Sequence, residues 1–310
     1  MWLDLSTGVN PWPWPIPADL PDAAWQRLPS RVDEEALIVA AREAYAVPAG
    51  AEIVAAAGTQ SLIQWLPQLA SAGPVAVVEP TYNEHARAWR MAGHEVIARP
   101  DLDDLSQAVR HVVVVNPNNP DGRVISRAAL ARTAALLQQR GGWLVVDEAF
   151  ADIEPETSVI ELCANWPVVV LRSFGKFYGL AGLRLGFAIA SPEIARPISL
   201  ALGPWPCSGP ALNIGGAALR DREWAGRARL VIQHRARKVD AVLANAGFMI
   251  VGGTGLFRLV RRSDAGKVHA SLATQHIWCR RFDWADDLLR FGLPPDDRDL
   301  ERLAVALASG

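Results

Sequence analysis

Lys176 is the residue whose type and setting most strongly suggest chemistry. It lies within the segment 173–184, whose sequence is SFGKFYGLAGLR, and the chain has only two other lysines, Lys238 and Lys267. Arginine carries nearly all the remaining positive charge, but arginine does not lose its proton in proteins. A desolvated lysine can, and its neutral amine then attacks a carbonyl group. The segment therefore predicts that Lys176 binds a carbonyl cofactor covalently, with pyridoxal phosphate (PLP) as the leading candidate.

Three further side chains could act on the ring of such a cofactor. Asp147 follows an apolar run, and a buried carboxylate needs a cation such as a protonated pyridine nitrogen, unless it caps a helix or pairs with an arginine. Asn119, in the segment NPNNPDG at 116–122, could bond a ring oxygen, unless the segment is only a turn. Tyr82 could stack on the heterocycle, or it could be an ordinary core or surface tyrosine.

A phosphate group could be held where a strand meets a helix. Gly58, Thr59 and Gln60 follow an apolar run and begin a helical pattern. The free N–H groups of a helix N-terminus bind phosphate, and glycine lets the backbone come close. Ser173 and Arg184, on either side of the lysine, could add a hydroxyl and a bidentate guanidinium. The alternative for Thr59 is a plain helix N-cap.

Two arginines near the C-terminus are candidates for binding the anionic groups of a substrate. Arg280 and Arg290 each lie in an apolar, strand-like segment, and arginines on half-buried strands usually meet anions. The alternative is a surface ion pair with an aspartate of the segment 283–287. The six histidines show no ligand spacing, so no metal site is predicted, and His85 is expected to be an ordinary polar residue of a helix.

The elements that must position these residues alternate along the chain. Short apolar strands are expected at 53–56, 75–78, 111–115, 143–146, 168–171 and 185–190, and helices at 33–45, 59–69, 83–92 and 126–139. Val-rich strands between helices are typical of a parallel sheet that is covered on both faces. The predicted fold class is therefore α/β, with the ligand groups at the carboxyl ends of the strands.

The pattern changes at both ends of this α/β region. Residues 1–30 are expected to form an irregular arm, because the prolines after Asn10 exclude a helix or a central strand. Its tryptophans, Trp12, Trp14 and Trp25, predict that the arm packs against something. Residues 31–195 would form a large PLP-binding domain, and residues 196–310 a small α/β domain. The small domain is expected to have helices at 210–219, 222–245, 267–274 and from 296, strands at 277–279 and 288–292, and a hairpin at 248–260 that turns at Gly252–Gly255.

Composition excludes several classes of protein. The net charge of −2 gives no sign of nucleic acid or membrane-surface binding. No apolar run approaches the roughly 20 residues that span a bilayer, and the first residues do not have the pattern of a signal peptide. Three scattered cysteines without a CxxC pair favour neither disulfides nor zinc. A soluble protein of the cytoplasm fits these features best.

Taken together, the motifs resemble those of the fold-type-I PLP-dependent enzymes of the class I and II aminotransferase family. The matching residues run in order from Gly58 to Arg290. The resemblance implies a large domain with a mostly parallel sheet between helices, a smaller C-terminal α/β domain, and a homodimer. It assigns Lys176 as the covalent link to PLP, Asp147 to the pyridine nitrogen, Asn119 to the phenolic oxygen and Tyr82 to ring stacking. The phosphate would be held by Gly58, Thr59, Gln60, Ser173 and Arg184, and the substrate α-carboxylate by Arg290.

Within this family the chain resembles the histidinol-phosphate aminotransferases and, more closely, the L-threonine-O-3-phosphate decarboxylases of cobalamin biosynthesis. The similar segments are 4–11, 147–152 and 203–210. This branch implies a small phosphorylated amino acid as substrate, decarboxylated to (R)-1-aminopropan-2-yl phosphate. Arg280 is the first candidate for the substrate phosphate, with the leader around Asn10 as a possible lid. Ser30 and Arg31 are weaker candidates.

Two departures weaken the reading as a plain aminotransferase. Phe150 stands where that branch usually has a tyrosine that bonds the cofactor oxygen, and Leu28 replaces a tyrosine that reaches the neighbouring subunit. A histidinol-phosphate-type aminotransferase and a PLP-binding scaffold without turnover remain alternatives.

Overall fold

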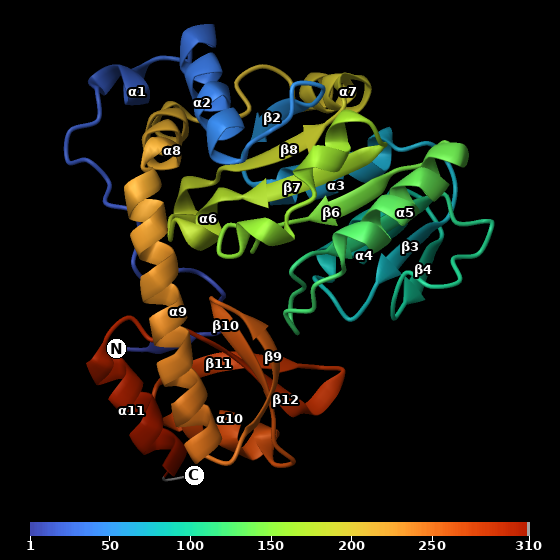
Figure 1. Cartoon of the computed structure of the whole chain (residues 1–310). Helices are drawn as coiled ribbons and strands as arrows, with labels where there is room; N and C mark the ends of the chain where they lie inside the picture. Colours follow the sequence, from blue (N-terminus) through green and yellow to red (C-terminus); the bar gives the residue numbers. More distant parts are fainter. Residues whose placement is uncertain (309–310) are drawn as a thin grey trace.

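The computed structural model describes residues 1–308, which form two β-sheets linked by a long helix (Figure 1). The larger sheet has seven strands in the order β2-β8-β7-β6-β5-β3-β4. Only β8 runs antiparallel to its neighbours, so the prediction of a mostly parallel sheet is confirmed. The strands are β2 (Glu52–Ala56), β3 (Val75–Val78), β4 (Val96–Arg99), β5 (His111–Val115), β6 (Leu144–Asp147), β7 (Val168–Ser173) and β8 (Gly186–Ala190).

Helices cover both faces of this sheet because its strands are apolar on both sides. The central strands β5, β6 and β7 are buried along nearly their whole length, as expected for parallel strands between helical layers. One layer contains α2 (Arg31–Ala44) and α5 (Arg127–Gln139), and the other contains α3 (Thr59–Leu69), α4 (Glu84–Met91) and α7 (Pro192–Leu202). The sequence pattern missed β4 and α7.

The smaller sheet has five strands in the order β1-β11-β12-β10-β9. It is antiparallel except where β1 meets β11. The predicted hairpin is present, but its turn follows Thr254, because Gly252 and Gly253 still belong to β9. The strands are β1 (Leu3–Leu5), β9 (Met249–Thr254), β10 (Phe257–Arg261), β11 (Ile277–Phe282) and β12 (Ala285–Gly292). The accompanying helices are α10 (Ala265–Thr274) and α11 (Asp297–Ala308).

Helices α8 (Gly209–Arg220) and α9 (Arg222–Asn245) connect the two sheets. Helix α8 packs against α2 beside the large sheet, and the 24-residue α9 reaches down to β9 and β10 (Figure 1). The predicted bounds of α9 match those observed. In the part of the chain that the structure describes, no helix is both long and apolar enough to span a membrane.

The N-terminal arm is more regular than expected. Its first residues form β1, which pairs with β11, and α1 (Asp22–Gln26) follows its proline-rich segment. The arm packs as predicted through Trp14, which is buried, and Trp12, whose indole Nε1 donates to the carbonyl of Pro295. The prediction is wrong for Trp25, which is 67% exposed.

Candidate active site

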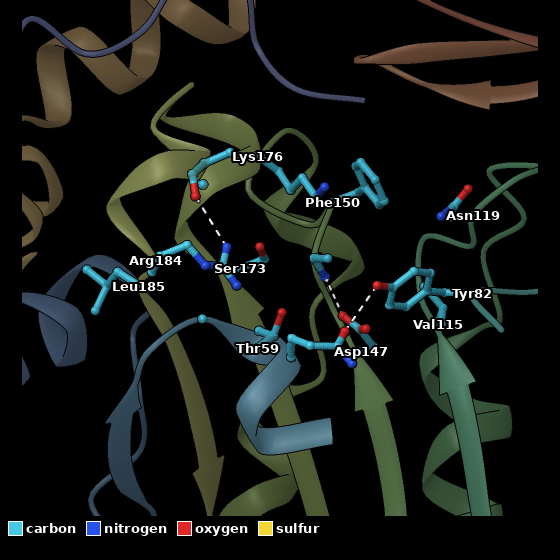
Figure 2. A pocket seen from close by; sticks show the side chains of 15 residues that line it. Thr59, Tyr82, Val115, Asn119, Asp147, Phe150, Ser173, Lys176, Arg184 and Leu185 are labelled. Carbon is cyan, nitrogen blue, oxygen red and sulfur yellow. Dashed lines mark hydrogen bonds between the residues drawn. The ribbon is translucent and has the colours of Figure 1, made fainter. Parts of the chain in front are cut away.

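One pocket at the carboxyl edge of the large sheet brings together all the predicted cofactor ligands. Figure 2 shows Ser173, Lys176 and Arg184 on one side of this pocket and Tyr82 and Asn119 on the other. These groups lie at one edge of the sheet because parallel strands end on the same side. The predicted residues that line the pocket are Gly58, Thr59, Gln60, Tyr82, Asn119, Asp147, Ser173, Lys176 and Arg184.

Lys176 lies on the short helix α6 (Phe174–Phe177), which begins directly after β7. Burial lowers the pKa of its amine below the ordinary value, and the nearby guanidinium groups of Arg290 and Arg184 act in the same direction. The carboxylate of Asp147 opposes this shift. The neutral amine, which is the form that bonds to a carbonyl, is therefore easier to reach at Lys176 than in an exposed lysine.

Asp147 ends β6 with its carboxylate buried in the floor of the pocket. One carboxylate oxygen accepts from the backbone N–H of Ala149 at 3.0 Å, and the other lies 2.9 Å from Nε2 of His85. The adjacent Glu148 points elsewhere and forms a buried ion pair with Arg172 at 2.9 Å. Of the two acidic side chains, only Asp147 faces the pocket and could meet a cationic ring nitrogen.

His85 is a residue of the site that sequence reasoning missed. It was expected to be an ordinary polar helix residue, but it is buried on α4 and bonded to Asp147. Its ring also meets the ring of Tyr82 edge-on, with the centroids 6.2 Å apart. A single histidine without a ligand spacing gives no signal in sequence, because its partner lies 62 positions away.

The start of α3 forms an anion cradle with Arg184. Gly58 precedes α3 with φ +82° and supplies no side-chain cap, so the first N–H groups of the helix remain available. A Cβ at Gly58 would lie only 2.6 Å from Nη2 of Arg184, so glycine permits this close approach. Arg184 itself has φ +54°. The cradle combines backbone donors with a guanidinium, as phosphate binding requires.

The side chain of Gln60 bonds to two neighbours in the pocket wall. Its Oε1 accepts from the hydroxyl of Tyr82 at 3.1 Å, and its Nε2 donates to Glu84 at 3.1 Å. Both ends of the amide are therefore engaged, which orients Tyr82 at the pocket wall. Only the backbone N–H of Gln60 remains for the cradle.

Arg290 connects the small sheet to the pocket. Its guanidinium donates to the side-chain oxygen of Asn119 and, at 2.6 Å, to the carbonyl of Ser6. It also lies over the ring of Phe257, 5.0 Å from the ring centroid. Burial and the charge of Arg280 lower the pKa of Arg290 to about 10, so the group remains a cation at neutral pH.

Arg280 lies directly opposite Arg290 in the β11–β12 pairing. Side chains of directly opposed residues project from the same face of a sheet. Arg280 is exposed, and within residues 1–308 it has no ion pair with any of the aspartates at 283, 286 and 287. The two arginines therefore extend from neighbouring positions on one face of the sheet, near enough for the charge of Arg280 to lower the pKa of Arg290.

Three weaker candidates for the substrate phosphate have other partners. Asn10 is buried, and its Nδ2 donates to the carbonyl of Phe177 at 2.8 Å instead of pointing into the pocket. Ser30 caps α2 in a capping box with Asp33, and Arg31 pairs with Glu35 on the surface. Local capping and packing thus account for the present position of each side chain, and their contact with substrate stays a prediction.

The comparisons with known proteins agree with this geometry. The profile described as "Aminotransferase class I and II" matches residues 33–307. The chain belongs to the class I and II aminotransferase family. Within the family it is 45% identical to a threonine-phosphate decarboxylase of Sinorhizobium sp. over 309 residues, covering 99% of this chain and 92% of the relative. It is 42% identical to the enzyme of that name from Pseudomonas aeruginosa, covering 99% and 91%.

A solved structure of the family shares the fold. The histidinol-phosphate aminotransferase of Sinorhizobium meliloti, solved in complex with pyridoxal-5'-phosphate, superposes with a TM-score of 0.83 at 21% identity and covers 99% of this chain and 90% of that one. The pocket of the present chain fits pyridoxal-5'-phosphate. It offers an anion cradle at Gly58 and Arg184, a buried carboxylate at Asp147, and an amine at Lys176 whose pKa is lowered.

Phe150 and Leu28, the two departures from the aminotransferase pattern, have different settings. Phe150 lines the pocket and meets Phe257 edge-on, with the centroids 5.1 Å apart. The wall beside Arg290 is therefore apolar at this point. Leu28 is exposed on the arm.

Proposed function

We propose that this chain is a PLP-dependent decarboxylase that converts L-threonine O-3-phosphate into (R)-1-aminopropan-2-yl phosphate and CO₂. The observation that carries the proposal is the pairing of two arginines, Arg280 and Arg290, directly opposite each other on one face of the small sheet. Threonine phosphate has two anionic groups, a carboxylate and a phosphate, and two arginines can hold both. The names of the two most similar relatives described above support the same substrate.

The residues of the large sheet would hold and tune the cofactor. Bound PLP supplies an electron sink conjugated to the substrate Cα. Asp147, fixed by His85 and the N–H of Ala149, would keep a proton on the pyridine nitrogen.

The cradle at Gly58, Thr59 and Arg184 would hold the phosphate, and Tyr82 would lie against the ring. Lys176 would link to the cofactor as a neutral amine, and once released and protonated it would be the acid that returns a proton to Cα.

The residues of the small sheet would select which bond at Cα breaks. The bond that is lost must stand perpendicular to the plane of the conjugated ring. Arg290, held by Asn119 and Ser6, would bind the carboxylate, while Arg280 would hold the phosphate and thereby fix the rotation of the substrate. The apolar rings of Phe150 and Phe257 would keep water from the carboxylate, and a desolvated carboxylate loses CO₂ more readily.

The test is incubation of the PLP-loaded protein with L-threonine O-3-phosphate in the absence of any keto acid. We expect catalytic release of CO₂ and aminopropanol phosphate, followed by mass spectrometry, and no turnover by Lys176→Ala. Absence of CO₂, together with conversion of the cofactor to its pyridoxamine form by histidinol phosphate, would instead identify an aminotransferase. Bound cofactor without either product would identify a non-catalytic protein.

Four further assignments stay predictions. The homodimer and the place in cobalamin biosynthesis rest on the family resemblance. The cytoplasmic location rests on composition, and the division into an arm, a large domain and a small domain at residues 30/31 and 195/196 rests on the pattern along the chain. Sedimentation of the holoenzyme tests the homodimer, and a monomer would contradict it.

A further inference from the structure

The N-terminal arm passes along the site and presents alternate residues to it. In Figure 1 the dark blue arm runs from the small sheet up to α1. Gly8 and Asn10 are buried, whereas Thr7 between Ser6 and Gly8 is exposed. Such an alternation is typical of a chain segment with one face packed against the protein. The contacts of Ser6, Gly8 and Asn10 therefore show what this face does.

Asn10 closes the end of the helix that carries Lys176. Its backbone N–H donates to the carbonyl of Lys176 at 2.9 Å, and its side-chain Nδ2 donates to the carbonyl of Phe177 at 2.8 Å. The side-chain oxygen of Asn10 accepts from the N–H of Trp12 at 3.0 Å, which fixes the orientation of the amide. The last carbonyls of any helix lack intrahelical hydrogen-bond donors. Here the donors come from a segment more than 160 residues away in sequence.

The contact between the arm and the lysine segment continues past Asn10. The N–H of Trp14 donates to the carbonyl of Tyr178 at 2.9 Å, so three consecutive carbonyls are bonded by the arm. Gly179 has φ +68°, and a Cβ there would lie 2.7 Å from the carbonyl oxygen of Asn10 and from Cα of Pro13. Only glycine allows this approach without displacement of one backbone.

The other end of the same segment holds Arg290. The carbonyl of Ser6 accepts from Nη2 of Arg290 at 2.6 Å. Between the two anchor points, a Cβ at Gly8 would lie 2.9 Å from the ring of Phe257 and 3.0 Å from that of Phe150. The arm thus contacts the carboxylate-binding arginine, the apolar wall and the lysine helix within five residues.

We propose that the segment Ser6–Asn10 is a fixed strap that sets the position of Lys176 relative to Arg290, with Asn10 as its positioning residue. The strap replaces the lid expected from sequence, because both polar ends of the Asn10 side chain are bonded to backbone groups and not to the pocket. The proposal deepens the proposed function, on which it rests only for the role of Lys176. The experiment below is therefore built on a property of Lys176 that needs no turnover.

The experiment compares Asn10→Ala with Asp221→Ala. Asp221 accepts from the indole of Trp14 at 3.1 Å and caps α9, so its loss loosens the arm without touching the carbonyls of Lys176 and Phe177. The first readout is the pH dependence of trace acetylation of Lys176 in the cofactor-free protein, measured by mass spectrometry. The chain has only two other lysines, Lys238 and Lys267, and both serve as internal references.

The midpoint is the pH at which acetylation of a lysine reaches half of its maximal rate. For Asn10→Ala we expect the midpoint of Lys176 to rise toward that of the reference lysines, since a loosened α6 is better solvated. We expect kcat of the holoenzyme to fall about tenfold with KM changed less than about twofold, because small misplacements of a reacting group lower the chemical rate. Asp221→Ala should lower the unfolding temperature but leave the midpoint and kcat as they are.

Two results would overturn the proposal. In the first, Asn10→Ala lowers the unfolding temperature while the Lys176 midpoint and kcat stay unchanged. In the second, Asp221→Ala shifts the midpoint as much as Asn10→Ala does. If Asn10→Ala does not fold, Asn10→Asp replaces it, because it keeps the size and the acceptor for Trp12 and removes the donor to Phe177. A wild-type protein that releases no CO₂ would contradict the proposed function, but the acetylation result would still decide on the strap.

Discussion

The two halves of the site are built on different principles. The cofactor half lies at the ends of β6 and β7 and in the turns after β2, β3 and β5, so most of its residues are placed by the strand just before them, and Arg184 lies just before β8. The second half, which we call the substrate half because we propose that it binds the substrate, consists of Arg290 and Arg280 on the small sheet, together with the arm. Its contacts join distant positions: Arg290 meets Asn119 and Ser6, which are 171 and 284 residues away.

The local and the long-range construction of the two halves correspond to two tasks, binding the cofactor and orienting the substrate. A sheet edge fixes the cofactor groups through backbone geometry that is shared across many parallel folds. The substrate groups depend on how a second sheet and a terminal segment pack against that edge. Changes in the first half should therefore affect the chemical step for every substrate, whereas changes in the second should affect substrate choice and orientation.

The largest expected effect comes from Asp147→Asn in the cofactor half. The amide cannot keep a proton on the pyridine nitrogen, so kcat should fall about 100-fold or more, as for loss of a key electrostatic partner in other active sites. Cofactor affinity should change much less, because the cradle at Gly58 and Arg184 is intact. Steady-state kinetics and absorbance titration with PLP measure the two quantities. Unchanged kcat would remove Asp147 from the mechanism.

The next largest effect should come from Arg280→Ala in the substrate half. One charge-assisted hydrogen bond contributes roughly 1.5–3 kcal/mol, so KM for L-threonine O-3-phosphate should rise about tenfold or more. Binding of L-threonine, which has no phosphate, should not change. Arg281→Ala is the matched control, since Arg281 is also exposed but is paired with Leu289 and so projects from the other face of β11. Equal losses in both variants would exclude a specific phosphate contact.

The cofactor half could be predicted from sequence because its signals are local. Each motif combines an apolar run with a glycine, proline or polar residue directly after it, and the run fixes where that residue lies in the sheet. The bounds of β5 and α9 were also predictable, because a run of valines and a long arginine- and alanine-rich pattern leave little freedom. The strand β4 and the helix α7 have weaker patterns and were missed.

The remaining parts of the site depend on partners that the sequence does not indicate. His85 has no spacing that points to Asp147, and only the packing of α4 against β3 and β4 brings its ring to the carboxylate at the end of β6. The Asn10 side chain was assigned to substrate, but its distant carbonyl partners on α6 could not be foreseen. Gln60 was placed correctly by its motif, but the direction of its side chain is set by Tyr82 and Glu84.

A smaller effect is expected where the two halves meet. The N–H of Gly253 on β9 donates to the carbonyl of Asp121 at 2.8 Å, and a Cβ at Gly122 would lie only 1.8 Å from the carbonyl oxygen of Gly253. Gly122→Ala should therefore destabilise the protein by about 1–3 kcal/mol through backbone strain and displacement of the hairpin, and it should raise KM more than it lowers kcat.

Gly93→Ala is the control for the strain alone. Gly93 has φ +87°, similar to the +72° of Gly122, but a Cβ there meets nothing within 4 Å. Urea unfolding of both variants gives the contribution of the contact as the difference between them. If the two variants lose equal stability and keep the same KM, the contact between Gly122 and Gly253 does not couple the halves.

The smallest effect should come from His111, at the end of β5 opposite the site. Its Nε2 lies 2.7 Å from the carbonyl of Ser71, and its Nδ1 accepts from the N–H of Trp143, so the ring fits as a neutral donor and acceptor. Burial, with a contribution from His94, lowers the pKa of His111 to about 4. Between about pH 6.5 and 4, His111 is therefore protonated in the unfolded chain but remains neutral in the folded chain.

The sign of the pH effect follows from this difference. The contribution of His111 is fully present above about pH 6.5 and is lost as the pH falls toward 4. Urea unfolding between pH 7.5 and 4.5 should show this loss, and His111→Gln should flatten it. Because the site lies at the other edge of the sheet, kcat of the folded His111→Gln enzyme at pH 7.5 should equal that of the wild type. A lower kcat would mean that the two edges of the large sheet are coupled, and the cofactor half would then be less local than its sequence motifs indicate.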